Sequence, residues 1–121
     1  MDNNTKHKKG DRIVTKVRLV REVNCDKCHN FYFEGWFRVY ATDTHYYKGN
    51  FVVWFDTADL AEHFDKERFT KKDIREYAGE LAYSFLAQAP YKRVTAETMR
   101  PFYEECRNTI ERYNDANIWA A

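Results

Sequence analysis

Proline, glycine and cysteine are scarce in this chain of 121 residues, which holds two, four and three of them. So few prolines and glycines exclude collagen-like repeats and linker-type low complexity. An odd set of three cysteines is not typical of a disulfide-rich secreted domain, so we expect reduced thiols and a cytoplasmic protein. Residues 1–10 are polar, without the apolar segment of a secretory signal, and are expected to form a flexible N-terminus.

Long hydrophobic runs and an excess of charge are missing as well. No window approaches the ~20 apolar residues of a membrane-spanning helix, so we expect no membrane partner. Twenty basic and nineteen acidic residues give a net charge of +1, which excludes a strongly basic coat for duplex DNA and a strongly acidic mimic of it. We find no glycine-rich phosphate loop, nucleophile elbow or paired-histidine motif, and we predict that the protein is not an enzyme.

Aromatic residues are what the chain has in surplus. Phenylalanine, tyrosine and tryptophan number nine, nine and three, against four isoleucines, four leucines and eight valines. A domain of this size cannot bury every ring, and tyrosine and tryptophan are enriched at binding surfaces. The surplus is therefore the first indication of a binding function.

The first half of the chain alternates with the period of two that is typical of β-strands. Three segments carry this pattern, 11–24, 31–42 and 46–55, and the short links between them favour antiparallel hairpins. We therefore predict a three-stranded antiparallel β-meander over about 11–55. Its apolar face is expected to carry Ile13, Thr15, Val17, Leu19, Phe31, Phe33, Phe37, Val39, Phe51, Val53 and Phe55, with Val14 and Val20 on the opposite face.

The second half has the spacing of amphipathic helices. We predict helices over 57–68, capped by Asp56 or Thr57, over 70–88, with Thr70 and Asp73 as a capping box, and over 95–113. Pro101 is expected in the first turn of the last helix, and 114–121 as a loosely held tail. Strands followed by helices predict one α+β domain over 11–113, with the helices packed on one face of the sheet. The stripe expected to cover the sheet consists of Ile74, Tyr77, Ala78, Leu81, Ala82, Phe85 and Leu86.

The one recognisable short motif is Cys25-Asp-Lys-Cys28-His29. It has the form of a c-type haem attachment site, which the missing export signal and the flanking strands disfavour. A Cys-x-x-Cys turn between strands offers zinc two thiolate ligands, Cys25 and Cys28, but the second pair that a tetrahedral site needs is absent from the spacing. We expect no cofactor, and zinc held by these two cysteines is the alternative. Cys106 is expected to be a small core residue.

A candidate binding surface lies on the sheet face opposite the phenylalanines. Rings interleaved with lysine and arginine allow bases to stack while the cations meet phosphates. Trp36 and Arg38 lie two residues apart on the middle strand, and we expect Trp54 of the next strand within reach of the same planar ligand. The predicted ligand-binding residues are Lys16, Arg18, Tyr32, Trp36, Arg38, Tyr40, Lys48 and Trp54.

Two functions fit this face. We predict first a non-enzymatic intracellular protein that binds a nucleotide or a nucleic-acid segment. The alternative is a protein–protein inhibitor or adaptor that docks the face on a partner enzyme, and a homodimer would also cover the face. In size and style the chain resembles the inhibitors and ligand-sequestering proteins that phages and mobile elements carry, which implies binding rather than catalysis.

Overall fold

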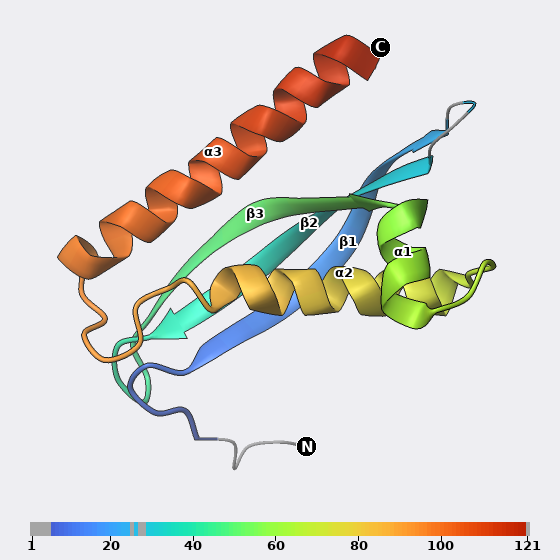
Figure 1. The fold of residues 1–121 in the computed structure, drawn as a ribbon. Coiled ribbons are helices and arrows are strands. Elements are labelled where there is room, and N and C mark those ends of the chain that lie inside the picture. Colours follow the sequence, from blue (N-terminus) through green and yellow to red (C-terminus); the bar gives the residue numbers. More distant parts are fainter. Residues whose placement is uncertain (1–5, 25, 27–28, 121) are drawn as a thin grey trace.

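The computed structural model describes residues 6–24, 26 and 29–120, with the side chains of the last helix as far as Asp115. Its strands form one antiparallel sheet in the order β1-β2-β3, and helix α2 crosses one face of that sheet (Figure 1). This arrangement confirms the predicted α+β fold. The elements are β1 Arg12–Asn24, β2 His29–Tyr40, β3 Tyr46–Asp56, α1 Thr57–Phe64, α2 Lys71–Leu86 and α3 Ala96–Ala120.

Helices α1 and α2 begin at the predicted capping residues. Asp56 and Asp59 each accept a hydrogen bond from the other's amide at 3.0 Å. Thr70 and Asp73 form the same reciprocal pair at 3.1 and 3.0 Å. Such pairs satisfy amides of the first turn that have no partner within the helix. Helix α1 is shorter than predicted, because Asp65 ends it in a left-handed backbone conformation with a φ of 54°.

Helix α3 begins at Ala96, one residue after its predicted start, but the place of Pro101 within it differs from the prediction. The Thr98 amide donates to the Thr95 hydroxyl at 3.2 Å, and the Thr95 amide donates to the Thr98 hydroxyl at 2.8 Å. Pro101 therefore lies in the second turn, not the first, where it removes one backbone hydrogen bond. Met99 and Phe102, which flank the proline, are both buried and hold the helix to the core through this position.

Helix α3 also ends later than predicted, at Ala120 instead of Tyr113, and it packs along the edge of β3 (Figure 1). Among the described residues, no helix combines the length and apolarity needed to cross a bilayer. The length of α3 instead lets a single helix run along the strand from one end of the sheet toward the other.

Two side chains of α3 bond the backbone edge of β3. The Tyr103 hydroxyl donates to the Lys48 carbonyl at 3.2 Å, and the Val52 amide donates to the Thr109 hydroxyl at 3.3 Å. Both backbone groups point away from β2, so they have no partner within the sheet. Thr109 is the buried polar residue of the core boundary, and its hydroxyl donates in turn to the Cys106 carbonyl at 2.7 Å. Helix α3 thus closes an edge that could otherwise accept another strand.

The core lies between the sheet and helices α2 and α3. Phe37 of β2 packs edge-on against Phe102 of α3, with ring centroids 5.2 Å apart. Phe51 of β3 stacks on Phe85 of α2 at 4.6 Å. The alternation predicted for β2 and β3 is confirmed on this covered face of the sheet, whose buried residues are Phe31, Phe33, Phe37, Val39, Phe51, Val53 and Phe55.

Small residues set how closely α2 approaches the sheet. Ala78 and Ala82 are completely buried, and Leu86 is nearly so. The larger members of the predicted stripe, including Leu81, are partly buried beside them. The helix therefore presents its alanine side to the sheet, and its bulkier residues fill the flanks.

Strand β1 departs from strict alternation at two bulges, formed around Thr15 and Val20. A bulge adds one residue and so exchanges the faces of the residues on either side of it. Val14 lies opposite Phe37 and packs against the core, while Ile13 lies on the other face. The predicted faces of Ile13 and Val14 are therefore wrong, and the cause is the first bulge.

The end of the N-terminal segment is held against the sheet. The Gly10 amide donates to the Tyr40 carbonyl at 2.8 Å, and the His7 ring stacks on the Tyr40 ring with centroids 4.1 Å apart. Gly10 has a φ of 88°, and a Cβ there would lie 2.1 Å from the Tyr91 carbonyl oxygen. Residues 7–10 thus belong to the packed domain, although the sequence assigned them to a flexible N-terminus.

Candidate functional site

The open face is the face of the sheet turned away from α2. Cross-strand partners point to the same side, so the strand register orders the side chains of this face into rows. Each row takes one side chain from β1, one from β2 and one from β3. The rows are Ile13–Arg38–Lys48, Lys16–Trp36–Asn50, Arg18–Glu34–Val52 and Arg21–Tyr32–Trp54.

Trp36 lies at the centre of the open face and is half-buried. The Lys16 ammonium and the Arg18 guanidinium lie 5.3 and 5.5 Å from the centroid of its ring. Trp36 also borders a depression of about 380 Å³, whose lining includes Arg38 and Lys48. The indole therefore remains accessible to a ligand from the open face.

Two cations stand opposite each other beside this depression. Arg38 and Lys48 are register partners, and the Lys48 carbonyl points outward to Tyr103, so their pair is of the non-hydrogen-bonded kind. Side chains lie closest at such pairs, with Cβ atoms ~4.5–5.5 Å apart, and like charges there repel. In the described part of the chain, neither cation has a carboxylate within ion-pair distance. The arrangement favours an anion between them.

The Arg38 side chain is positioned by two tyrosines. Its guanidinium donates to the Tyr40 hydroxyl at 3.5 Å and lies 4.5 Å from the centroid of the Tyr46 ring. The hydrogen bond to Tyr40 and the nearby Tyr46 raise the pKa of Arg38 further above its ordinary value, so its charge is permanent. Tyr40 is itself buried beneath His7, in contrast to the prediction that it contacts a ligand. Its role here is to hold Arg38.

Glu34 is the single carboxylate within these four rows, and both of its oxygens are engaged. One accepts a hydrogen bond from Arg18 at 3.4 Å, and the other accepts one from the Asn50 amide group at 2.6 Å. Glu34 therefore balances part of the Arg18 charge and leaves the other cations of the face unmatched. The open face is positive although the whole chain is close to neutral.

A second group of rings lies at the far end of the open face. The Tyr32 ring contacts Trp54 at a centroid distance of 6.4 Å and Tyr113 of α3 at 5.4 Å. Helix α3 therefore reaches round the edge of β3 onto the open face, where Val52 is buried. Trp54 stays 40 % exposed.

The two tryptophans lie too far apart to share one planar ligand. Trp36 is the register partner of Asn50, and Trp54 lies four residues further along β3. At the usual rise of a strand this separation is about 14 Å. The expectation that one ring system contacts both is wrong, and the open face instead has two separate ring sites.

Arg21 and Asn50 belong to the open face and were missed in the sequence. The bulge at Val20 places Arg21 opposite Tyr32, and a bulge leaves no regular mark in an alternating sequence. Asn50 lies between Lys48 and Val52 in the alternation of β3, so its place on the open face could have been predicted from the sequence. Its polar side chain completes the lining of the depression beside Trp36.

The predicted metal ligands Cys25 and Cys28 lie outside the described residues, and zinc binding stays a prediction. The neighbouring His29 ring nitrogen lies 2.7 Å from a Glu22 carboxylate oxygen. Among the residues that the structure describes, no three His, Cys, Asp or Glu side chains are grouped so as to hold a metal ion. Cys106 is buried, and burial raises the pKa of its thiol to about 12, which is unfavourable for a nucleophile.

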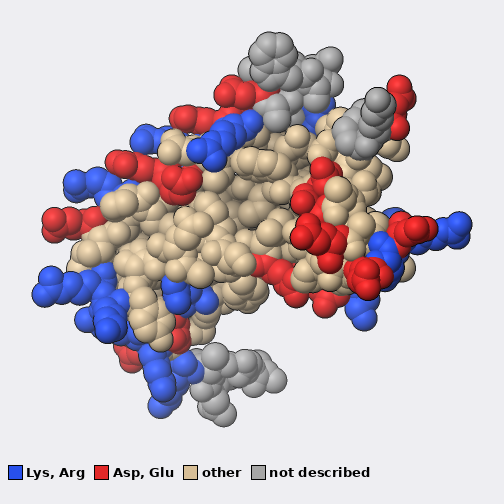
Figure 2. Space-filling model, in the orientation of Figure 1, with Lys and Arg blue, Asp and Glu red and all other residues tan. Residues whose placement is uncertain are grey.

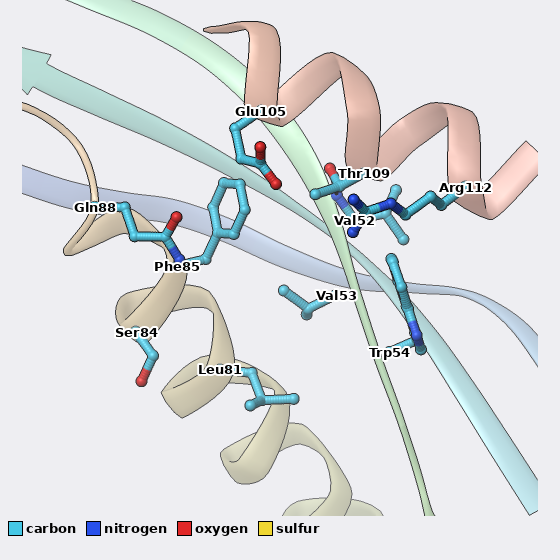
Figure 3. Close-up of a pocket in the computed structure, with 10 residues that line it drawn as sticks. All are labelled: Val52, Val53, Trp54, Leu81, Ser84, Phe85, Gln88, Glu105, Thr109 and Arg112. Carbon is cyan, nitrogen blue, oxygen red and sulfur yellow. Dashed lines mark hydrogen bonds between the residues drawn. The ribbon is translucent and has the colours of Figure 1, made fainter. Parts of the chain in front are cut away.

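A separate groove lies on the helix side of the sheet, between α2 and α3. Leu81 and Phe85 line it from α2, Glu105 and Arg112 line it from α3, and Val53 lies between them (Figure 3). The groove measures about 360 Å³. Figure 2 shows a hollowed band between the two helices in which uncharged side chains predominate. Its apolar lining residues, such as Leu81, Phe85 and Val53, are suited to an apolar segment.

Comparison with models of protein families, with curated proteins and with solved structures finds no match for this chain. The open face brings an accessible indole, an unmatched pair of cations and a depression together in one place.

Proposed function

We propose that this protein binds a nucleotide or a nucleic-acid segment on the open face, without catalysing a reaction. The observation that carries the proposal is the Arg38–Lys48 pair beside the half-buried ring of Trp36. A phosphate between the two cations would relieve their mutual repulsion, while a base lies against the indole. Nucleotides are common ligands that combine a planar ring with a phosphate group.

Lys16 and Arg18 already lie against the Trp36 ring and compete with a base for it. At about 0.5–1 kcal/mol each, the two exposed cation–π contacts sum to about 1–2 kcal/mol, whereas base–aromatic stacking is worth about 1–3 kcal/mol per base. Replacement of the cations by a base therefore costs little net interaction energy. The displaced cations stay within reach of the ligand's phosphates, so the exchange loses little of their interaction energy.

The expected affinity for one nucleotide is low. One stacked base contributes about 1–3 kcal/mol, and each exposed charge contact adds about 0.2–1 kcal/mol. A total of about 4 kcal/mol corresponds to a Kd of about 1 mM. Binding of a mononucleotide should therefore be weak and sensitive to salt.

Titration of the protein with thymidine monophosphate and with a short oligothymidylate at low salt tests the proposal. We expect quenching of tryptophan fluorescence, lost in Trp36→Ala, and weaker binding in Arg38→Gln and Lys48→Gln. The matched control is Arg68→Gln, which removes an exposed arginine from the loop between α1 and α2 and should bind like the wild type. If neither compound binds at low salt, the proposal is wrong.

The alternative function is an inhibitor or adaptor that docks on a partner protein. The groove between α2 and α3 favours it, because Trp54 lies at the groove and is 40 % exposed. Binding of a partner protein in this groove should be lost in Trp54→Ala and retained in Arg38→Gln. Binding of thymidine monophosphate, which reaches only the Trp36 site, should weaken in Arg38→Gln and not in Trp54→Ala, so the same two variants distinguish the two functions.

A further inference from the structure

We infer that the ligand of the open face is a single-stranded nucleic acid of about four nucleotides, laid along the strands from the Arg38–Lys48 pair to Arg21. The inference rests on the proposed function and names the class of ligand that the same face takes. Two observations support the inference: cationic side chains occur in each row of the open face, and the two ring sites are spaced along the same strands.

Each of the four rows of the open face contains at least one lysine or arginine. In the first row they come from β2 and β3, as Arg38 and Lys48, and in the next three rows from β1, as Lys16, Arg18 and Arg21. The four rows extend from residue 38 to residue 32 of β2, which spans about 20 Å. One nucleotide occupies a fraction of this length, whereas a short strand places a phosphate near each of several cations.

The two ring sites are spaced along the same strands. Trp36 stands in the second row, and Tyr32 with Trp54 in the fourth, about 14 Å further along the sheet. A base on the first site cannot touch the second, but two bases of one extended strand can occupy both. The rings lie on β2 and β3, and most of the cations lie on β1. The bases of a bound strand would therefore lie over β2 and β3, and its phosphates would lie beside them over β1.

A single strand fits this face better than a duplex. The bases of a duplex are stacked on each other, so their faces are not available to rings such as Trp36. Duplex binding also relies on a broad basic surface, and this chain carries a net charge of +1. Tyr113 of α3 contacts Tyr32 on the open face. Helix α3 therefore reduces the width of open sheet that is available to a ligand on the β3 side.

The number of phosphates in contact is measurable from the salt dependence of binding. For single strands, each neutralised phosphate changes the slope of log K against log salt by about −0.7. A strand with one phosphate in contact, held by Arg38 and Lys48, should give a slope of about −0.7. A strand that also meets Lys16 and Arg21 should give a slope of about −2.

The experiment measures fluorescence anisotropy of labelled oligothymidylates of increasing length, with thymidine monophosphate and a duplex of matched length as unlabelled competitors. We expect the affinity to rise with length up to about four nucleotides and then to level off. Arg21→Gln should weaken oligothymidylate binding by up to about fivefold and leave thymidine monophosphate binding unchanged. Arg68→Gln is the charge-matched control, and thermal unfolding shows that both variants fold.

Each other outcome overturns a defined part of the argument. If mononucleotide and oligothymidylate bind equally well and Arg21→Gln changes neither, the strand inference is wrong and the proposed function stands. If the duplex competes as strongly as the single strand, the ligand class is wrong. If neither thymidine monophosphate nor oligothymidylate binds at low salt, both the inference and the proposed function are wrong.

Discussion

Trp36 and Phe37 are neighbours in the chain and lie on opposite faces of one sheet. Phe37 is 1 % exposed and packs edge-on against Phe102, whereas Trp36 is half-buried between Lys16 and Arg18. The covered face gathers phenylalanines, which have no polar atom to satisfy. The open face gathers tyrosine and tryptophan, which offer a ring and a polar group to water or to a ligand. The kind of ring, more than the number of rings, distinguishes a core from a binding surface.

Two sets of cations differ in the same way. Lys66, on the helix side, lies 2.7 Å from a carboxylate oxygen of Asp73. On the open face, Arg38 and Lys48 face each other without a carboxylate partner among the described residues. Matched charges stabilise helix ends, and unmatched charges repel until an anion binds.

The largest effect on the folded state is expected at Phe37. Phe37→Ala removes a buried ring that contacts Phe51 and Phe102, and such changes reduce the free energy of unfolding by about 3–5 kcal/mol. Chemical denaturation followed by circular dichroism measures the loss. A decrease below about 1 kcal/mol would show that the covered face is not the core and would remove the contrast with Trp36.

A smaller loss is expected where α3 bonds the edge of β3. Thr109→Val keeps the shape of the side chain but removes the acceptor of the Val52 amide, and an unsatisfied buried amide costs about 1–3 kcal/mol. Denaturant unfolding of Thr109→Val and of the exposed control Thr44→Val measures the difference. Equal stability of the two variants would mean that α3 does not close this edge.

The sequence was sufficient for the regular parts of the fold. The phenylalanine alternation of β2, the N-cap at Asp56 and the reciprocal cap Thr70–Asp73 follow from local rules, and the structure shows each of them. Local rules suffice here because each feature depends on residues that are close together in the chain.

The features that the sequence did not reveal depend on contacts between distant residues. The bulges at Thr15 and Val20 arise as β1 pairs with β2, and they bring Arg21 to the open face. The 14 Å between the tryptophan sites follows from the register of β2 and β3, which no single segment specifies. The path of α3 around the sheet depends on Thr109 meeting Val52, fifty-seven residues earlier in the chain.

Trp36→Ala should affect the ligand and not the fold, which tests the comparison most directly. The change removes two exposed cation–π contacts, so we expect a loss of about 1–2 kcal/mol in the free energy of unfolding. Binding of oligothymidylate should fall by about five- to 150-fold, because stacking of one base is worth about 1–3 kcal/mol. A stability loss as large as that of Phe37→Ala would place Trp36 in the core and contradict the binding role.

The smallest effect concerns a matched charge on the helix side. The Lys66 side chain, and after it the Thr70 amide, donates to the Asp73 carboxylate and lowers its pKa below the ordinary value of 3.8. Because the pKa is lower in the folded than in the unfolded protein, Asp73 contributes stability above pH 3.8 that is lost as the pH falls through the folded value.

Lys66→Gln should raise the pKa of Asp73 toward its ordinary value, measured by NMR titration of its carboxyl carbon. Lys48→Gln, on the open face, should leave that titration unchanged. An Asp73 titration that is identical in the wild type and in Lys66→Gln would show that this pair is not formed in solution, and that charges on the helix side are no better matched than those on the open face.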